Sequence, residues 1–188
     1  MKLELLLEDD DLSRLSGKMP SIFSPVSPLV VLVPGGAFGP SKCWSPKRFA
    51  QTADWIIDNY GATVAISIAP NKAEKQIAKD IISTAKNKLY SLGDTPLTLG
   101  ELKSFIAEAD LVITNDTGPR HIAIALGKKV ISLFGPNNPD WTQTGYENEI
   151  QIVGVADCAP CDKADCSQME HLCMKSITVE MVCEAVGK

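Results

Sequence analysis

Short apolar runs alternate with amphipathic segments along most of the chain. Strands are predicted at 29–33, 63–68, 111–113, 130–134 and 150–155, with a weaker one at 89–92. The run 29–33 is continuously apolar, which is typical of a strand buried on both faces of a sheet. Apolar residues recur at helical spacing in 46–60, 72–88, 98–109, the segment before Gly127, and 178–186. Strands that alternate with helices in this way predict right-handed crossovers and a parallel sheet covered on both faces, which is an α/β fold.

Several of the predicted helices have recognisable residues at their ends. Ser45 and Pro46 are suited to an N-cap and a first turn, and Thr98 with Glu101 forms a capping-box pattern. Gly61 and Gly127 follow two other helices as C-terminal stops. These signals support the helix positions independently of the apolar pattern.

The first 28 residues differ from the rest of the chain. An acidic run covers 8–11, and serines and prolines are frequent between 21 and 28. We interpret 1–28 as an N-terminal segment with a helix and a linker, and 29–188 as one domain, because 188 residues is the length of a single domain.

Composition and charge narrow the classes of function. The net charge of -5 and the isoelectric point of about 5.0 argue against a nucleic-acid partner or an anionic membrane surface. No apolar run approaches the roughly 18 residues that span a bilayer, and the N-terminus lacks a signal-peptide pattern. We therefore expect a cytoplasmic protein.

The turn Asp116-Thr117-Gly118-Pro119 joins the strand at 111–113 to the next helix. The first amides of a helix have no intrahelical acceptor and the helix dipole is positive there, so a strand, a tight turn and a helix start favour an anion. Asp116 and Thr117 add a carboxylate and a hydroxyl suited to sugar hydroxyls. The alternative is a capping turn without a ligand.

Two other loops follow predicted strands. The loop 34–44 contains three glycines, which let the backbone approach a ligand, and Lys42, which can neutralise phosphate or lie in solvent. Glu74 lies near the start of a predicted helix. Its carboxylate can accept hydrogen bonds from ribose hydroxyls, or it can serve only as a favourable negative charge at the helix N-terminus. His121 lies one turn into its helix and is either a donor to the ligand or a structural residue. Because the carboxyl ends of parallel strands share one edge, all three loops can line one crevice.

Six cysteines in a reducing compartment need a role other than structural disulfides. The loop at 158–173 contains C-x2-C-x4-C-x6-C, formed by Cys158, Cys161, Cys166 and Cys173. These four cysteines can bind zinc, form disulfides or stay as free thiols. Because only the first pair has the spacing of a zinc knuckle, we expect a loop that is held by packing and binds no metal. The chain has no GxSxG, HExxH or Ser-His-Asp set, and therefore no evident general base.

Four segments together resemble one family of bacterial enzymes. They are VPGGAFGPSKCWSPKRFA, the helix with Glu74, TNDTGPRHIAIALGKKVISLFGP and CAPCDKADCSQMEHLCM. This set, over about 29–188, resembles the ADP-heptose–lipopolysaccharide heptosyltransferases of glycosyltransferase family 9, especially the heptosyltransferase II type. The resemblance implies the C-terminal, donor-binding half of a GT-B glycosyltransferase, which has two Rossmann-like domains.

The resemblance also implies a reaction, with ADP-heptose as donor and the lipopolysaccharide inner core as acceptor, and with inversion at the sugar. Lys42 would contact the diphosphate, Glu74 the ribose, Asp116 the heptose hydroxyls, and Thr117–Gly118 the phosphates, supported by His121. No cofactor is implied.

The general base, an aspartate, and the acceptor site would belong to an N-terminal domain outside these 188 residues. Peripheral association with the membrane is an expectation for the full enzyme. Other nucleotide sugars, a non-catalytic binding module that needs a partner chain, and a zinc-binding interaction module are the alternatives.

Overall fold

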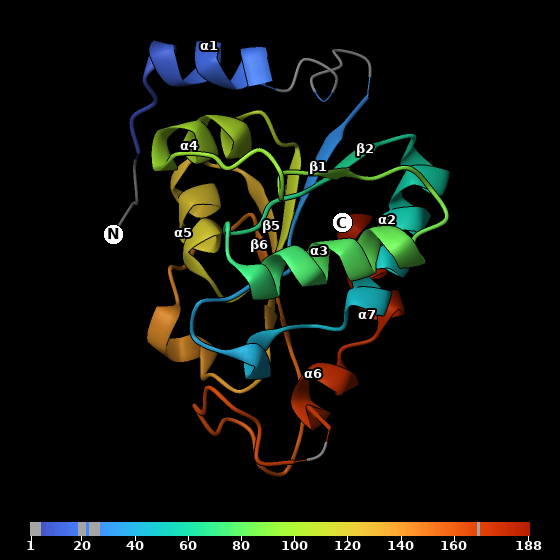
Figure 1. Ribbon diagram of the computed structural model, residues 1–188. Helices are drawn as coiled ribbons and strands as arrows, with labels where there is room; N and C mark the ends of the chain where they lie inside the picture. Colours follow the sequence, from blue (N-terminus) through green and yellow to red (C-terminus); the bar gives the residue numbers. More distant parts are fainter. Residues whose placement is uncertain (1–4, 19–21, 23–26, 169) are drawn as a thin grey trace.

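The computed structural model describes residues 5–18, 22, 27–168 and 170–188. It confirms the parallel sheet, which has six strands in the order β3-β2-β1-β4-β5-β6 (Figure 1). The strands are β1 (Leu29–Val33), β2 (Thr63–Ile66), β3 (Tyr90–Ser91), β4 (Leu111–Asn115), β5 (Lys129–Phe134) and β6 (Glu149–Val153). All neighbouring strands pair in parallel, so their carboxyl ends lie along the same edge.

Seven α-helices and two short 3-10 helices accompany the strands within the described part of the chain. The α-helices are α1 (Asp9–Lys18), α2 (Pro46–Tyr60), α3 (Lys72–Thr84), α4 (Leu99–Ala107), α5 (Gly118–Ala125), α6 (Leu172–Ser176) and α7 (Val179–Val186). The 3-10 helices are η1 (Pro40–Lys42) and η2 (Pro139–Thr142). The predicted stops hold, because Gly61 and Gly127 take left-handed φ angles of 60° and 72°, and the capping box of α4 is formed.

Side chains alternate between the two faces of the sheet, as the apolar strands require. On β1, Val30 and Leu32 belong to a core shared with α2, α3 and α7. Val31 and Val33 belong to a second core shared with α4 and α5. Figure 1 shows these two groups of helices on opposite sides of the sheet. Each fully buried aliphatic side chain contributes about 1.5–3 kcal/mol by leaving water.

The predicted helix of the N-terminal segment is present as α1, which lies along α4 (Figure 1). Leu15 is fully buried there, and Lys18 Nζ lies 2.6 Å from Glu101 Oε1. Gly100 brings the helices close, because a Cβ at this position would lie 2.0 Å from Asp11 Oδ2. Most of the predicted linker lies outside the described residues, and the domain boundary at residue 28 stays a prediction.

Several predicted element ends are wrong. The helix predicted at 98–109 ends at Ala107, and the strand predicted at 111–113 continues to Asn115. The helix predicted to reach residue 88 ends at Thr84, because Asp54 on α2 accepts the amides of Lys86 and Asn87 and turns the chain away. The second strand ends two residues early, at Ile66. The last strand ends at residue 153 instead of 155, since Gly154 lies directly against the Cys173 carbonyl.

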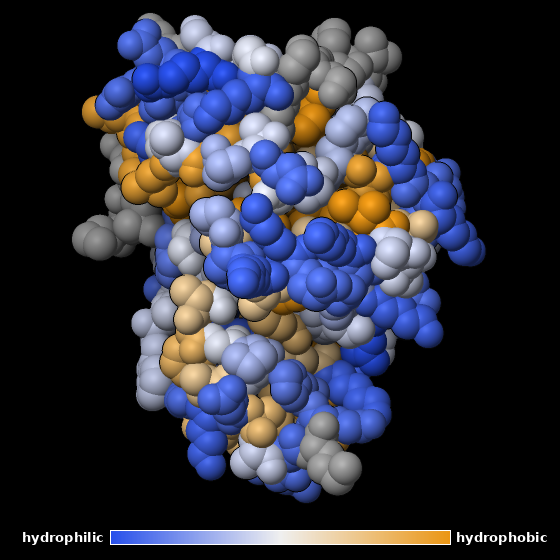
Figure 2. Space-filling model, in the orientation of Figure 1, coloured by the Kyte–Doolittle hydropathy of each residue, from blue (hydrophilic) through white to orange (hydrophobic). Residues whose placement is uncertain are grey.

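The surface of α3 in view in Figure 2 is hydrophilic. No helix among the described residues is long and apolar enough to cross a membrane.

Candidate functional site

Strands β1 and β4 are neighbours, but the chain leaves them toward helices on opposite faces. The loops therefore diverge at this point and leave a crevice at the carboxyl edge, as in other open α/β sheets. A cavity of about 410 Å³ lies here, lined by loop residues after β1, β2 and β4. The prediction that the three loops meet in one crevice is confirmed. Its outer wall is apolar and consists of Leu92, Leu97, Leu99 and Leu102.

Glu74 lies on the wall of this cavity at the first turn of α3. Its Oε2 accepts the Ala69 amide at 2.8 Å, and its own amide donates to Asn71 Oδ1 at 2.9 Å. Gly35 allows the carboxylate this close, since a Cβ there would lie 2.1 Å from Oε2. Glu74 therefore places its charge at the N-terminus of α3, as the structural alternative expects, and also faces the cavity.

A second space of about 270 Å³ continues from the first, because Ala37, Thr117 and Gly118 line both. We call it the polar space, because most of the residues that line it have charged or polar side chains, whereas most of those that line the first do not. The residues that line only this second space are Phe38, Lys42, Asp116, His121 and Thr142. Five of the six predicted site residues thus surround it, and Glu74 lies in the adjoining space.

Lys42 and Asp116 form a buried ion pair at the centre of the polar space. Lys42 Nζ lies 2.8 Å from Asp116 Oδ2 and donates to the Asp116 carbonyl at 3.2 Å. The side chains are only 11% and 6% exposed, so the alternative of a solvated lysine is wrong. The Phe38 ring lies 4.7 Å from Nζ and covers the pair. The charge of Lys42 is therefore held inside the site.

The turn between β4 and α5 places the other predicted residues. Thr117 is the N-cap residue of α5, but its side chain makes no capping hydrogen bond; its Oγ1 lies 3.3 Å from Thr114 Oγ1. Gly118 begins the helix and is exposed. Of the first three residues of α5, Pro119 has no amide hydrogen and the Arg120 amide donates to the Thr117 carbonyl at 3.1 Å. The Gly118 amide and the helix dipole are therefore the features of this helix start that favour an anion in the polar space.

His121 is half-buried beside the same space. Burial, together with the positive charges of Arg120 and Lys42, lowers the pKa of its imidazole, and this outweighs the opposite effect of Asp116 and Glu149. In the ligand-free chain the neutral form of the imidazole is therefore favoured at pH 7.

Three functional positions were missed by sequence reasoning. Asn115 donates to the carbonyls of Pro34 and Gly35 at 2.7 and 3.2 Å, which fixes the glycine loop to β4. Arg120 is fully buried and Thr142 approaches Asp116 Oδ1 at 3.4 Å. No sequence signal identified these positions, because Asp116 precedes α5 and the contacts come from loops and strands distant in sequence.

The cysteine-containing loop supports η1, which carries Lys42. Ser41 donates from its amide to the Ala164 carbonyl at 3.1 Å and from its hydroxyl to the Lys163 carbonyl at 2.6 Å. A Cβ at Gly39 would lie 2.3 Å from the Ala164 oxygen, so only glycine permits this approach. The loop therefore contributes to the position of Lys42.

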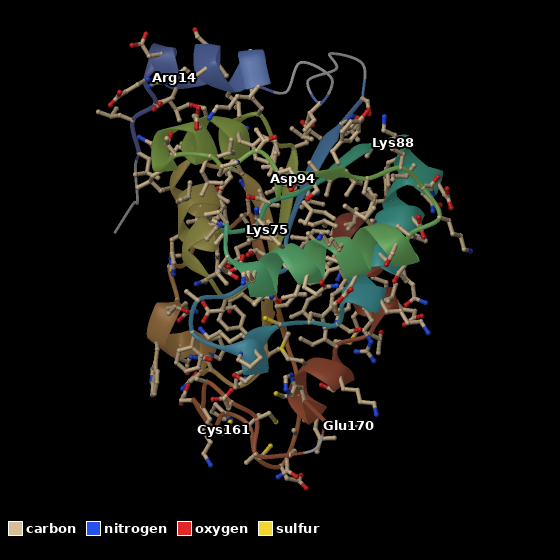
Figure 3. All side chains as sticks on the ribbon, in the orientation of Figure 1. Arg14, Lys75, Lys88, Asp94, Cys161 and Glu170 are labelled. Atoms are coloured by element: carbon tan, nitrogen blue, oxygen red, sulfur yellow. The ribbon has the colours of Figure 1, made fainter. Side chains whose placement is uncertain are left out.

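All six cysteines are free thiols in this structure. Cys161 and Glu170 lie at the end of the molecule below α6 (Figure 3). Within the described part of the chain, no three cysteine, histidine or acidic side chains are placed to hold a metal ion. Burial raises the pKa of the Cys173 thiol, which disfavours the thiolate that a metal needs. The metal content of the loop stays a prediction for elemental analysis of protein prepared without chelator.

Comparison with known proteins extends these observations. Residues 2–172 match the model of glycosyltransferase family 9 (heptosyltransferase). The chain is 31% identical over 176 residues to lipooligosaccharide heptosyltransferase 2 of Campylobacter jejuni, covering 91% of this chain and 54% of the relative. It is 28% identical to lipopolysaccharide heptosyltransferase 2 of Escherichia coli, over 85% of this chain and 46% of that protein.

Two solved structures share the fold. ADP-heptose lps heptosyltransferase II of E. coli superposes with a TM-score of 0.77 at 23% identity, covering 98% of this chain and 52% of that one. A family 9 glycosyltransferase from Veillonella parvula gives a TM-score of 0.81 at 21% identity, with 99% and 53% covered. The chain spans about half the length of the relatives that it matches.

Proposed function

Because the chain belongs to glycosyltransferase family 9, we propose that it is the donor-binding half of a heptosyltransferase that transfers heptose from ADP-heptose to the lipopolysaccharide inner core. One observation carries this proposal. A single crevice joins an apolar space, with a carboxylate on its wall, to a polar space that contains a lysine, an aspartate and a helix start. This succession corresponds to a base, a ribose, a diphosphate and a sugar.

The donor occupies the two spaces in that order. The adenine lies against the apolar wall formed by the four leucines, two of which are on α4. The ribose hydroxyls donate to the Glu74 carboxylate. The diphosphate lies between Lys42 and the start of α5, the two sources of positive potential in the polar space. The heptose then reaches Asp116, whose carboxylate accepts hydrogen bonds from its hydroxyls.

The residues of this chain act on the leaving group of the reaction. As the bond between heptose and ADP breaks, negative charge grows on the diphosphate, and Lys42 and the Gly118 amide at the start of α5 stabilise it. Removal of the acceptor's proton needs a general base. We place that base and the acceptor site in the other half of the enzyme, which works in the cytoplasm at the membrane surface.

A crystal of the chain with ADP-heptose tests this assignment. The diphosphate should lie within hydrogen-bond distance of Lys42 Nζ and of an α5 amide, and the ribose within that distance of Glu74. A nucleotide bound elsewhere, or in the reverse direction along the crevice, would contradict the proposed function.

The affinity for ADP-heptose should rise as the pH falls from 8 to 6. The free chain holds the pKa of His121 below its ordinary value, whereas a bound diphosphate would favour the imidazolium and raise that pKa. Binding then takes up a proton, so affinity rises by at most about tenfold per pH unit. ADP-heptose is the right probe because its esterified diphosphate does not titrate in this range.

The control for this prediction is His121→Asn, which keeps a hydrogen-bond donor and does not titrate. Its dissociation constant, measured by calorimetry at each pH, should be flat. An equal slope in both proteins would assign the pH dependence to another group.

The same pKa shift affects stability with a defined sign. A histidine whose pKa is depressed by folding contributes stability above its unfolded pKa, near 6.5, and this contribution is lost as the pH falls through the folded pKa. Binding measurements should therefore stay at pH 6 and above, where the native fold is least affected.

A further inference from the structure

We propose that Arg120 is a positioning residue for the donor sugar: it holds the Asp116 carboxylate in place when the diphosphate engages Lys42. This inference rests on the proposed function, in which Asp116 binds the heptose and Lys42 the diphosphate. Neither the family resemblance nor the motif spacing assigned a role to Arg120.

Asp116 is held from two sides in the ligand-free structure. Its Oδ2 receives Lys42 Nζ at 2.8 Å, while its Oδ1 faces Arg120 Nη1 at 3.6 Å and the Thr142 hydroxyl at 3.4 Å. A diphosphate competes for the charge of Lys42 and also brings negative charge close to Asp116. The carboxylate would then be repelled from the position that the sugar needs, unless a second cation remains.

Arg120 is that second cation, and the sheet fixes its orientation. The side chain is fully buried, and its Nε and Nη2 form a bidentate pair with Glu149 at 2.6 and 3.0 Å. Its Nη1 donates to the Thr142 carbonyl at 3.1 Å and also faces Asp116. With its other nitrogens bound, the guanidinium can present only this edge to the site.

The Glu149 carboxylate is itself fixed by hydrogen bonds from side chains on the sheet. The Ser132 hydroxyl on β5 donates to its Oε1 at 2.5 Å, and the Gln151 amide on β6 donates to its Oε2 at 3.0 Å. Burial favours the neutral acid, but the hydrogen bonds from Arg120, Ser132 and Gln151 outweigh it and lower the pKa of Glu149. The pair stays charged, so Arg120 remains in place when a ligand draws Lys42 away.

The expected effect is specific to the sugar. Arg120→Gln should leave the dissociation constant for ADP within about twofold, because Lys42 and α5 carry the diphosphate. It should weaken ADP-heptose binding by roughly tenfold, the loss of one charge-assisted contact. A merely structural role would weaken both ligands alike, so the ratio of the two dissociation constants is the readout. Both are measured by calorimetry.

Two companion variants sharpen the test. Asp116→Asn should abolish the preference for ADP-heptose over ADP, and adding Arg120→Gln to it should change this preference little further, because the two residues act on one contact.

Lys47→Gln is the control: it removes an exposed positive charge outside the site and should change neither dissociation constant. If circular dichroism shows Arg120→Gln to be unfolded, the double variant Arg120→Met/Glu149→Gln replaces it, because it removes both buried charges together.

The outcomes separate this inference from the proposed function. Loss of the sugar advantage in Arg120→Gln, with ADP binding retained, is the expected result. A native chain that prefers ADP-heptose to ADP, together with an Arg120→Gln chain that keeps the same preference, would overturn only the role of Arg120. A native chain that binds both ligands equally, or neither, would overturn the proposed sugar contact and this inference with it.

Discussion

Replacing Lys42 by alanine is expected to weaken the binding of ADP-heptose by roughly ten- to a hundredfold. The substitution removes a charge-assisted contact with the diphosphate, which contributes about 1.5–3 kcal/mol. It also leaves Asp116 without the ammonium group that lies 2.8 Å away, so the carboxylate repels the incoming anion. Calorimetry at low salt measures this loss, since screening is weakest there.

Lys47→Ala is the matched control, because Lys47 is an exposed lysine on α2 outside the crevice. Its dissociation constant should equal that of the native chain. A thermal melt of Lys42→Ala separates lost binding from lost folding, since Lys42 is buried. An unchanged dissociation constant in a folded Lys42→Ala chain would show that the lysine does not meet the diphosphate.

The second large effect concerns transfer by the chain alone. Loss of a general base lowers a rate by roughly 10²–10⁴-fold, and an acceptor that is not held beside the donor lowers it further. The purified 188 residues should therefore bind the donor but form product at least roughly a hundredfold more slowly than a full-length relative. Mass spectrometry of an acceptor incubated with ADP-heptose measures this difference.

Mixing the chain with the separately produced N-terminal half of a relative provides the positive control for transfer. Product that appears only in the mixture would support a division of donor and acceptor sites between the halves. Efficient transfer by the 188 residues alone would show that a base exists within them, and the assignment of the reaction would then be wrong.

The sheet and most of the site could be predicted because both depend on local patterns. A fully apolar run such as 29–33 is compatible with burial on both faces only in a covered sheet, and β1 has these bounds. Polar turns after such strands must meet at one edge, which is why the loops with Lys42, Glu74 and Asp116 converge. Their substrate roles stay predictions.

The remaining features depend on contacts between segments that are distant in sequence. Arg120 is on a helix with apolar neighbours, and its burial is favourable because it pairs with Glu149 on β6, 29 residues later in the chain. Asp54 ends α3 from another helix. Asn115 ends β4, and its side-chain amide donates to the Gly35 carbonyl, 80 residues earlier in the chain. No periodicity or spacing in one sequence records such pairs.

Calorimetric titration of the native chain with ADP-heptose, ADP and UDP-glucose tests the central claim most directly. A donor site for ADP-heptose predicts one ligand per chain, with ADP-heptose bound more tightly than ADP, and UDP-glucose bound more weakly than either. Equal affinity for the three ligands, or no heat with any of them, would contradict the claim that this crevice binds the heptose donor.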